Sequence, residues 1–181
     1  MKRVVLIVFA ATAMASGAWA QSQSDIDTAV LAAPPQMKDG AMVIKWKPDY
    51  TYDTLRKGTN KLVCFDKSGM PGQQAFSIEC TSQANIPRVA QNLKFESEPD
   101  RTKRTAMIAA AEKDGSRIKP EYGSVWFHLQ GANKEGARTH KTIAMPGATA
   151  ASTGLPDNAQ AGGVWVMDAG TSGAHLMIPG D

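Results

Sequence analysis

Two cysteines, Cys64 and Cys80, constrain the fold of this chain more than any other feature of its sequence. They lie in KLVCF and FSIEC, which both have strand-like composition, and the intervening DKSGMPGQQ carries turn residues. Two neighbouring antiparallel strands place opposed residues at a Cα separation that a disulfide tolerates. We therefore predict a disulfide across a β-hairpin. A metal-binding pair or a reactive thiol is the alternative, but the C-x-x-C spacing typical of reactive thiols is absent.

The N-terminus has the organisation of a secretory signal peptide. Lys2 and Arg3 precede an apolar stretch from residue 4 to about 15, and Ala18-Trp19-Ala20 forms a small-x-small cleavage signature. The stretch of about a dozen residues is too short to cross a bilayer, which needs roughly 20. We predict cleavage near Ala20, no membrane span, and a periplasmic or extracellular protein. The residue directly after the cut is Gln21 and not a cysteine, so a lipid anchor has no acceptor residue.

The charge of the mature chain excludes one common class of partner. The whole sequence carries a formal net charge of +3, and removal of Lys2 and Arg3 with the signal peptide lowers it to +1, because no acidic residue leaves with them. A nearly neutral chain has no overall field that attracts a phosphate backbone. We therefore expect no nucleic acid partner.

The mature chain, residues 21–181, has the size of one domain. A short helix is expected in DIDTAVLAAPP. A long helix is expected in ESEPDRTKRTAMIAAAEKDG, with Ser97 as its N-cap and Gly115 at its end. We expect strands at 42–46, 122–131, 162–170 and 174–180 in addition to the two cysteine strands. The last three have apolar residues on both faces, which is typical of central strands. The segment 146–163 shows no periodicity and is predicted to be a mobile loop.

These elements predict an α+β fold in a single domain. The expected architecture is a mainly antiparallel sheet of about five or six strands, packed with one long helix and one or two short helices, and one disulfide. We see no internal repeat and no second domain in the sequence.

Histidine and methionine residues are the candidate metal ligands. His175 and Met177 fall on the same face of a predicted strand, and imidazole with thioether suits copper. His128 lies in another predicted strand, and His140 lies in the loop that is expected to follow it. The alternative is that these side chains fill the core, which is the common role of methionine. No C-x-x-C-H motif is present, which excludes covalent haem, and no cofactor is predicted.

Asp168 is the candidate carboxylate of a polar site. It ends a predicted apolar strand, where burial would raise its pKa, but as a lone carboxylate at a strand end it is expected instead to accept backbone N–H bonds in the turn that follows. Acid-base catalysis would require Asp168, His175 and His128 to gather around one pocket. No catalytic motif is evident in the sequence.

Three short blocks, DTLRKGTNKLVC, YGSVWFHLQG and AHLMIP, carry a resemblance. Together they resemble a loosely defined family of small exported bacterial proteins of unknown function, which have an LR-x-GTN stretch before a cysteine. The resemblance implies export and a single domain. It implies no reaction and no catalytic residue.

The sequence therefore predicts an exported, non-catalytic binding or envelope-associated protein. Its partner would be a small molecule, an envelope component or a protein. A periplasmic protein that handles copper or zinc is the first alternative. An enzyme of unrecognised type is the second.

Overall fold

The cysteine hairpin lies near the middle of one sheet in the computed structural model, which describes residues 22–179. Cys64 and Cys80 face each other directly in the antiparallel register of two strands and form a disulfide, with a Cα–Cα distance of 4.1 Å. Both side chains are fully buried. The predicted disulfide and its place across a hairpin are confirmed.

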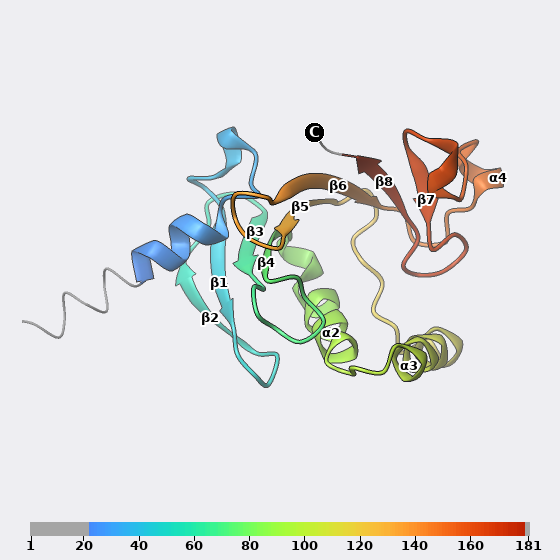
Figure 1. Ribbon diagram of the computed structural model, residues 1–181, viewed down its shortest axis with the longest axis horizontal. Coiled ribbons are helices and arrows are strands. Elements are labelled where there is room, and N and C mark those ends of the chain that lie inside the picture. Colours follow the sequence, from blue (N-terminus) through green and yellow to red (C-terminus); the bar gives the residue numbers. More distant parts are fainter. Residues whose placement is uncertain (1–21, 180–181) are drawn as a thin grey trace, which may run out of the picture.

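The described chain forms one mixed sheet of eight strands in the order β2-β1-β3-β4-β5-β6-β8-β7 (Figure 1). All neighbouring pairs are antiparallel except β1 and β3. The strands are β1 (Met42–Trp46), β2 (Tyr52–Arg56), β3 (Leu62–Asp66), β4 (Phe76–Ser82), β5 (Val125–Gly131), β6 (Arg138–Ala144), β7 (Trp165–Met167) and β8 (His175–Pro179). The helices are one at 22–29, the short 3₁₀ turns η1 (Pro35–Met37), η2 (Gln83–Asn85) and η3 (Ala159–Ala161), and the α-helices α2 (Ile86–Glu96), α3 (Arg101–Asp114) and α4 (Ala150–Thr153).

The α+β class is confirmed, but the predicted number of strands was too low. The missing strands are β2 and β6, whose sequences YDTLR and RTHKTIA are mostly polar and partly exposed. His140 consequently lies on strand β6 and not on a loop. The segment 162–170 contributes only the three residues of β7, and this strand is at the edge of the sheet, so the prediction of a central strand was wrong there.

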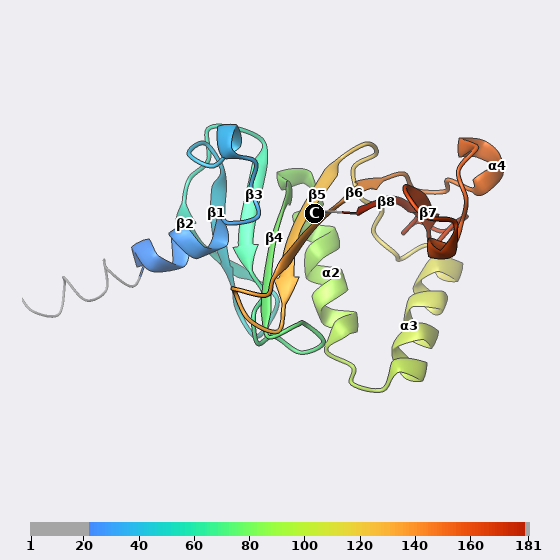
Figure 2. The same ribbon diagram turned by 45° about the horizontal axis from the view of Figure 1, so that its top comes forward.

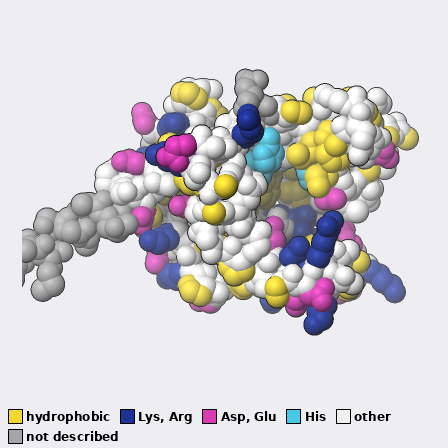
Figure 3. All heavy atoms as spheres, in the orientation of Figure 1, with side chains coloured by type: hydrophobic (Ala, Val, Ile, Leu, Met, Phe, Trp, Pro, Cys, Tyr) yellow, Lys and Arg dark blue, Asp and Glu magenta, His cyan; other side chains and the backbone are white. Residues whose placement is uncertain are grey.

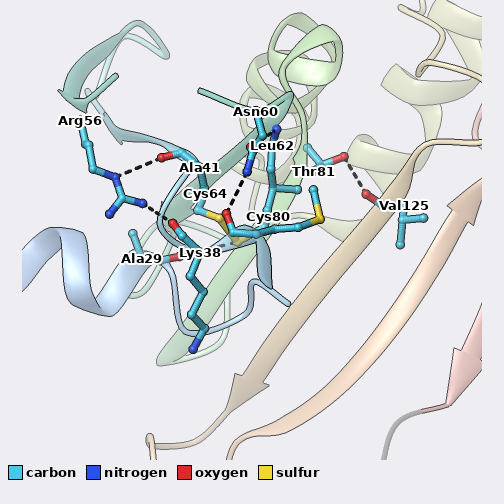
Figure 4. The surroundings of a disulfide bond; sticks show 11 residues. Ala29, Lys38, Ala41, Arg56, Asn60, Leu62, Cys64, Cys80, Thr81 and Val125 are labelled. Atoms are coloured by element: carbon cyan, nitrogen blue, oxygen red, sulfur yellow. Dashed lines mark hydrogen bonds between the residues drawn. A yellow bond between two sulfur atoms is a disulfide. The ribbon is translucent and has the colours of Figure 1, made fainter. Parts of the chain in front are cut away.

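Alternation along the central strands gives the sheet two different faces. On one face, Val63 and Phe65 pack with Val89 and Leu93 of α2. On the other face, the disulfide packs with Ala33 and its neighbours. The helix at 22–29 covers this second face, as Figure 4 shows for Ala29 beside the disulfide. Alternate residues of each strand therefore face opposite sides of the sheet, and each side is covered by its own helical layer.

The predicted long helix begins later than expected. Its N-cap is Asp100, whose carboxylate accepts hydrogen bonds from the backbone N–H groups of Thr102 and Lys103. Ser97 instead ends the preceding helix, α2, which the sequence did not predict. Gly115 ends α3 with a left-handed backbone, as expected. Helices α2 and α3 lie on the same side of the sheet (Figure 2).

The LR-x-GTN stretch covers the end of β2 and the connection that follows it. Its side chains form hydrogen bonds to the segment that precedes β1. The guanidinium of Arg56 donates to the carbonyl oxygens of Ala41 and Lys38, and the amide of Asn60 donates to that of Met37 (Figure 4 shows the Arg56 bonds). A Cβ at Gly58 would lie 2.6 Å from the backbone nitrogen of the first residue of β1, so only glycine fits. These contacts give the stretch a structural role.

The C-terminal part of the described chain completes the sheet. Strands β7 and β8 pair with each other in antiparallel register and form a hairpin. Within 146–163 the chain forms α4, whose capping box joins Thr149 and Ser152, and the turn η3. The mobility of this segment remains a prediction. The predicted signal peptide lies outside the described residues, among which no helix combines the length and apolar character that a membrane span requires.

Candidate functional site

A polar pocket of about 570 Å³ lies between the sheet and the two long helices. Strands β4, β5, β6 and β8 form one wall, and residues of α2, α3 and the segment after α3 form the other. Figure 3 shows the hollow, with histidine side chains on one side and lysine or arginine side chains below. This volume falls within the range typical of small-molecule sites.

Three titratable side chains form a row across the sheet wall. Glu79 lies opposite His128 on the next strand, and His128 lies opposite His140 on the strand after that. All three line the pocket. The two imidazole rings stack with centroids 4.3 Å apart and planes 7° from parallel. Burial, followed by the charge that His128 can carry, lowers the pKa of His140 to about 4, so its ring is neutral near pH 7.

A buried ion pair begins this row. The ammonium of Lys67 lies 2.7 Å from Glu79 Oε2, and both side chains are almost completely buried. Burial alone would raise the pKa of Glu79, but the charge of Lys67 and the interaction with His128 outweigh it and lower this pKa to about 2. His128 Nδ1 lies 3.3 Å from the same Oε2, in an orientation that does not make a hydrogen bond.

Two buried arginines form the helix wall. Arg88 projects from α2, and Arg117 follows α3. Their exposed fractions are only 6% and 9%, although each carries a full charge. Asn92 Oδ1 accepts a hydrogen bond from each guanidinium, which holds the two groups side by side. Burial, and then the charge of Arg117, lowers the pKa of Arg88 to about 10, so both remain cationic at pH 7.

All four candidate ligand and polar residues named from the sequence line this one pocket: His128, Asp168, His175 and Met177. His175 Nδ1 lies 2.7 Å from the carbonyl oxygen of Gly173. Because a carbonyl only accepts, Nδ1 must carry the proton, and Nε2 of the neutral ring is the acceptor. Asp168 follows β7 with φ of 53°, and its side chain is exposed, so the burial considered as one possibility for it is absent.

The sequence did not single out Lys67, Arg88 or Arg117, which also line the pocket, and it did not place His140 on a strand. Lys67 and Glu79 both lie inside the cysteine hairpin. Its register places Phe65 opposite Glu79, so Lys67 is two residues farther along the chain, at the end of the neighbouring strand and within reach of the Glu79 carboxylate. Arg88 was missed because its helix was missed. The available signal was Pro87 in the first turn of an amphipathic segment, which is a common helix start.

Three buried polar atoms on the pocket walls have no hydrogen-bond partner: Glu79 Oε1, Arg117 Nε and His128 Nδ1. In the part of the chain that the structure describes, only Trp46 Nε1 and Ser77 Oγ share this property. Buried polar atoms in folded proteins are nearly always satisfied by protein or by an ordered water or ligand. Their concentration here marks this pocket as the candidate site.

Two other features do not offer comparable chemistry. Within residues 22–179, no group of three or more His, Cys, Asp or Glu side chains is placed to hold a metal ion. A larger and shallower groove of about 960 Å³ runs between α2 and α3, and its lining includes Phe95, Met107 and Ile118. It has no unpartnered buried charge. Metal handling remains a prediction from the sequence.

Comparisons with protein-family models, curated proteins and solved structures found nothing that matches this chain. The resemblance to small exported bacterial proteins therefore remains a prediction.

Proposed function

We propose that this protein is an exported binding protein that holds a small polar molecule in the pocket between its sheet and helices. The observation that carries the proposal is the set of unpartnered buried atoms on the pocket walls, contributed by Glu79, Arg117 and His128. Export rests on the N-terminal sequence.

The physical argument concerns the cost of leaving such groups unpaired. A buried polar group without a hydrogen bond costs about 1–3 kcal/mol, and a charged one costs more. The pocket collects three of them where room for a ligand exists. A bound polar molecule would recover these hydrogen bonds, so the arrangement favours binding over core packing.

Native mass spectrometry of the protein purified from its own cells, without chelators, tests the proposal. We expect the mature mass, two protons lower because of the disulfide, with a small organic adduct. Met177→Trp places bulk in the pocket and should abolish the adduct. The matched variant Met107→Trp places the same bulk in the groove between α2 and α3 and should retain it.

Two outcomes would contradict the proposal. One is a bare mass for the wild type, both as purified and after incubation with a metabolite extract of the same cells. The other is an adduct that Met177→Trp retains as well as Met107→Trp does. An adduct of copper or zinc, lost in His175→Ala, would instead support the metal-handling alternative.

An enzyme is the second candidate, and the row of Glu79, His128 and His140 supports it. A neutral imidazole can accept a proton as a general base, and His140 is neutral, stacked on His128 and in the same row as the ionised Glu79. Incubation of the wild type with the metabolite extract should then deplete one compound and form another, and His140→Gln should stop the conversion. If the protein instead binds one compound and leaves it unchanged, it is not an enzyme that acts on that compound.

A further inference from the structure

We propose that the ligand is a small organic oxyanion whose carboxylate or phosphate is held jointly by Arg88 and Arg117. This inference rests on the proposed function and adds the charge and orientation of the ligand. Among the described residues, no ion pair within 4.0 Å includes Arg88 or Arg117. Their guanidiniums are therefore the only buried cationic pair in this part of the chain without a carboxylate partner.

Neutral acceptors hold both guanidiniums in place. Asn92 Oδ1 lies 3.1 Å from Arg88 Nε and 2.6 Å from Arg117 Nη2. Arg88 Nη1 also donates to the carbonyl of Ile118 and to the hydroxyl of Ser172, and Arg117 Nη1 donates to Gln91 Oε1. These bonds fix the positions of the two cations without pairing either of them directly with a carboxylate. An oxyanion would supply a direct partner.

Two of the three nearby acidic side chains, Glu112 and Glu96, have other hydrogen-bond partners. Glu112 accepts hydrogen bonds from the backbone N–H and the hydroxyl of Ser172. Glu96 accepts one from the amide of Gln73 at 2.6 Å. Asp168 is exposed at the mouth of the pocket. They moderate the field around the arginines without making an ion pair with them.

Donors remain for a ligand. Arg117 Nε is buried without a partner, and Arg88 Nη2 makes no hydrogen bond to any described residue. Gly173 lies close to this donor, because a Cβ there would be only 3.3 Å from Arg88 Nη2 and 3.6 Å from Asp168 Oδ2. The missing side chain therefore lets the guanidinium of Arg88 approach the backbone.

Two apolar side chains in the pocket lining indicate a ligand with an organic body. Met167 and Met177 of the two C-terminal strands line the pocket and offer flexible apolar contact. A carboxylate with a branched alkyl chain should therefore bind more tightly than acetate or inorganic phosphate, which have no such body.

The test follows the arginine side-chain N–H signals of the full mature protein by ¹H–¹⁵N NMR at constant ionic strength. The probes are inorganic phosphate, acetate, 3-methylbutanoate and its neutral analogue 3-methylbutanamide. We expect the three anions to shift the Arg117 Nε–H signal saturably, with 3-methylbutanoate the tightest. The neutral amide should bind at least about tenfold more weakly, because it forms no charge-assisted pair.

Two glycine variants separate this site from adventitious binding. Gly173→Ala keeps both arginines but brings a Cβ to 3.3 Å from Arg88 Nη2, a donor that the anion would use, so anion affinity should fall about tenfold or more. Gly136→Ala, in the β5–β6 connection, brings its Cβ to 3.2 Å from Asn133 Oδ1 and is a matched control that should bind normally.

The inference is overturned if no anion shifts the signal saturably, if the amide binds as well as the acid, or if Gly173→Ala binds like the wild type. Any of these results together with a retained ligand in the mass spectrum would leave the proposed function standing. Saturable anion binding with a bare native mass would support the anion site and count against the proposed function.

Discussion

The charge of Glu79 is balanced inside the protein chiefly by the ammonium of Lys67. Lys67→Met should destabilise the protein by about 3–5 kcal/mol, because it leaves a buried carboxylate without its main partner. The double variant Lys67→Met, Glu79→Gln should recover much of this loss. Urea unfolding monitored by circular dichroism measures both. Equal stability of the single and double variants would show that Glu79 does not depend on Lys67.

His140 should make stability depend on pH below neutrality. Its pKa is lowered from 6.5 to about 4 in the folded protein, so the unfolded chain takes up the proton first as the pH falls. Stability should therefore decrease from about pH 6.5 down to about pH 4. In His140→Gln, the melting temperature should fall less over this interval than in the wild type. His175→Gln serves as the control, and an unchanged slope in His140→Gln would refute the assignment.

The start of α3 depends on one cap. Asp100→Ala removes the acceptor of two backbone N–H groups and should cost about 1 kcal/mol. Ser97→Ala should cost much less, because the Ser97 hydroxyl only donates to the carbonyl of Lys94 at the end of α2. Urea unfolding compares them. A larger effect of Ser97→Ala would favour the helix start expected from the sequence.

The disulfide ties β3 to β4 at the centre of the sheet. It joins residues 16 positions apart, and a loop of this size predicts a loss of about 3 kcal/mol in the Cys64→Ala, Cys80→Ala variant. Urea unfolding of this variant and of the wild type, with and without reductant, measures the loss. Reductant should affect only the wild type. If the variant is as stable as the oxidised wild type, the disulfide does not contribute to stability, and strand pairing alone holds β3 beside β4.

Elements with a distinct signal in their own sequence could be predicted, and elements without one could not. The cysteine strands, β1, β5 and β8 show apolar runs or alternation and were found. Strands β2 and β6 carry mostly polar residues because much of each is exposed, and only pairing with a neighbour makes them strands. Helix α2 was missed although its amphipathic face packs on the sheet.

The free energy of unfolding should differ between the elements of the molecule. Strands β3 and β4 are almost entirely buried, whereas α3 buries only Ala111 and β7 is a three-residue edge strand. Backbone N–H groups of β3 and β4 should therefore exchange with solvent only on global unfolding, and those of α3 and β7 should exchange by local opening. Hydrogen exchange monitored by NMR or mass spectrometry tests this order. Protection of α3 equal to that of β3 would contradict it.

The composition of the candidate site could be predicted only in part. His128, His175 and Met177 were singled out because alternation in a strand can be seen in the sequence, and all three line the pocket. Arg88 and Arg117 were not, because nothing local distinguishes them from exposed arginines. They are buried and adjacent only after α2 and the segment following α3 fold against the sheet.

The amino-acid sequence determined the α+β class, the cysteine pairing and most of the central strands, because each depends on residues that are near one another in the chain. The tertiary structure alone decided the strand order, the two helical layers and the pocket. It brings Glu79 of β4, Arg117 after α3 and His175 of β8 to a single cavity. Charge, burial and the absence of a partner are properties of such neighbours in space, and local sequence patterns do not specify them.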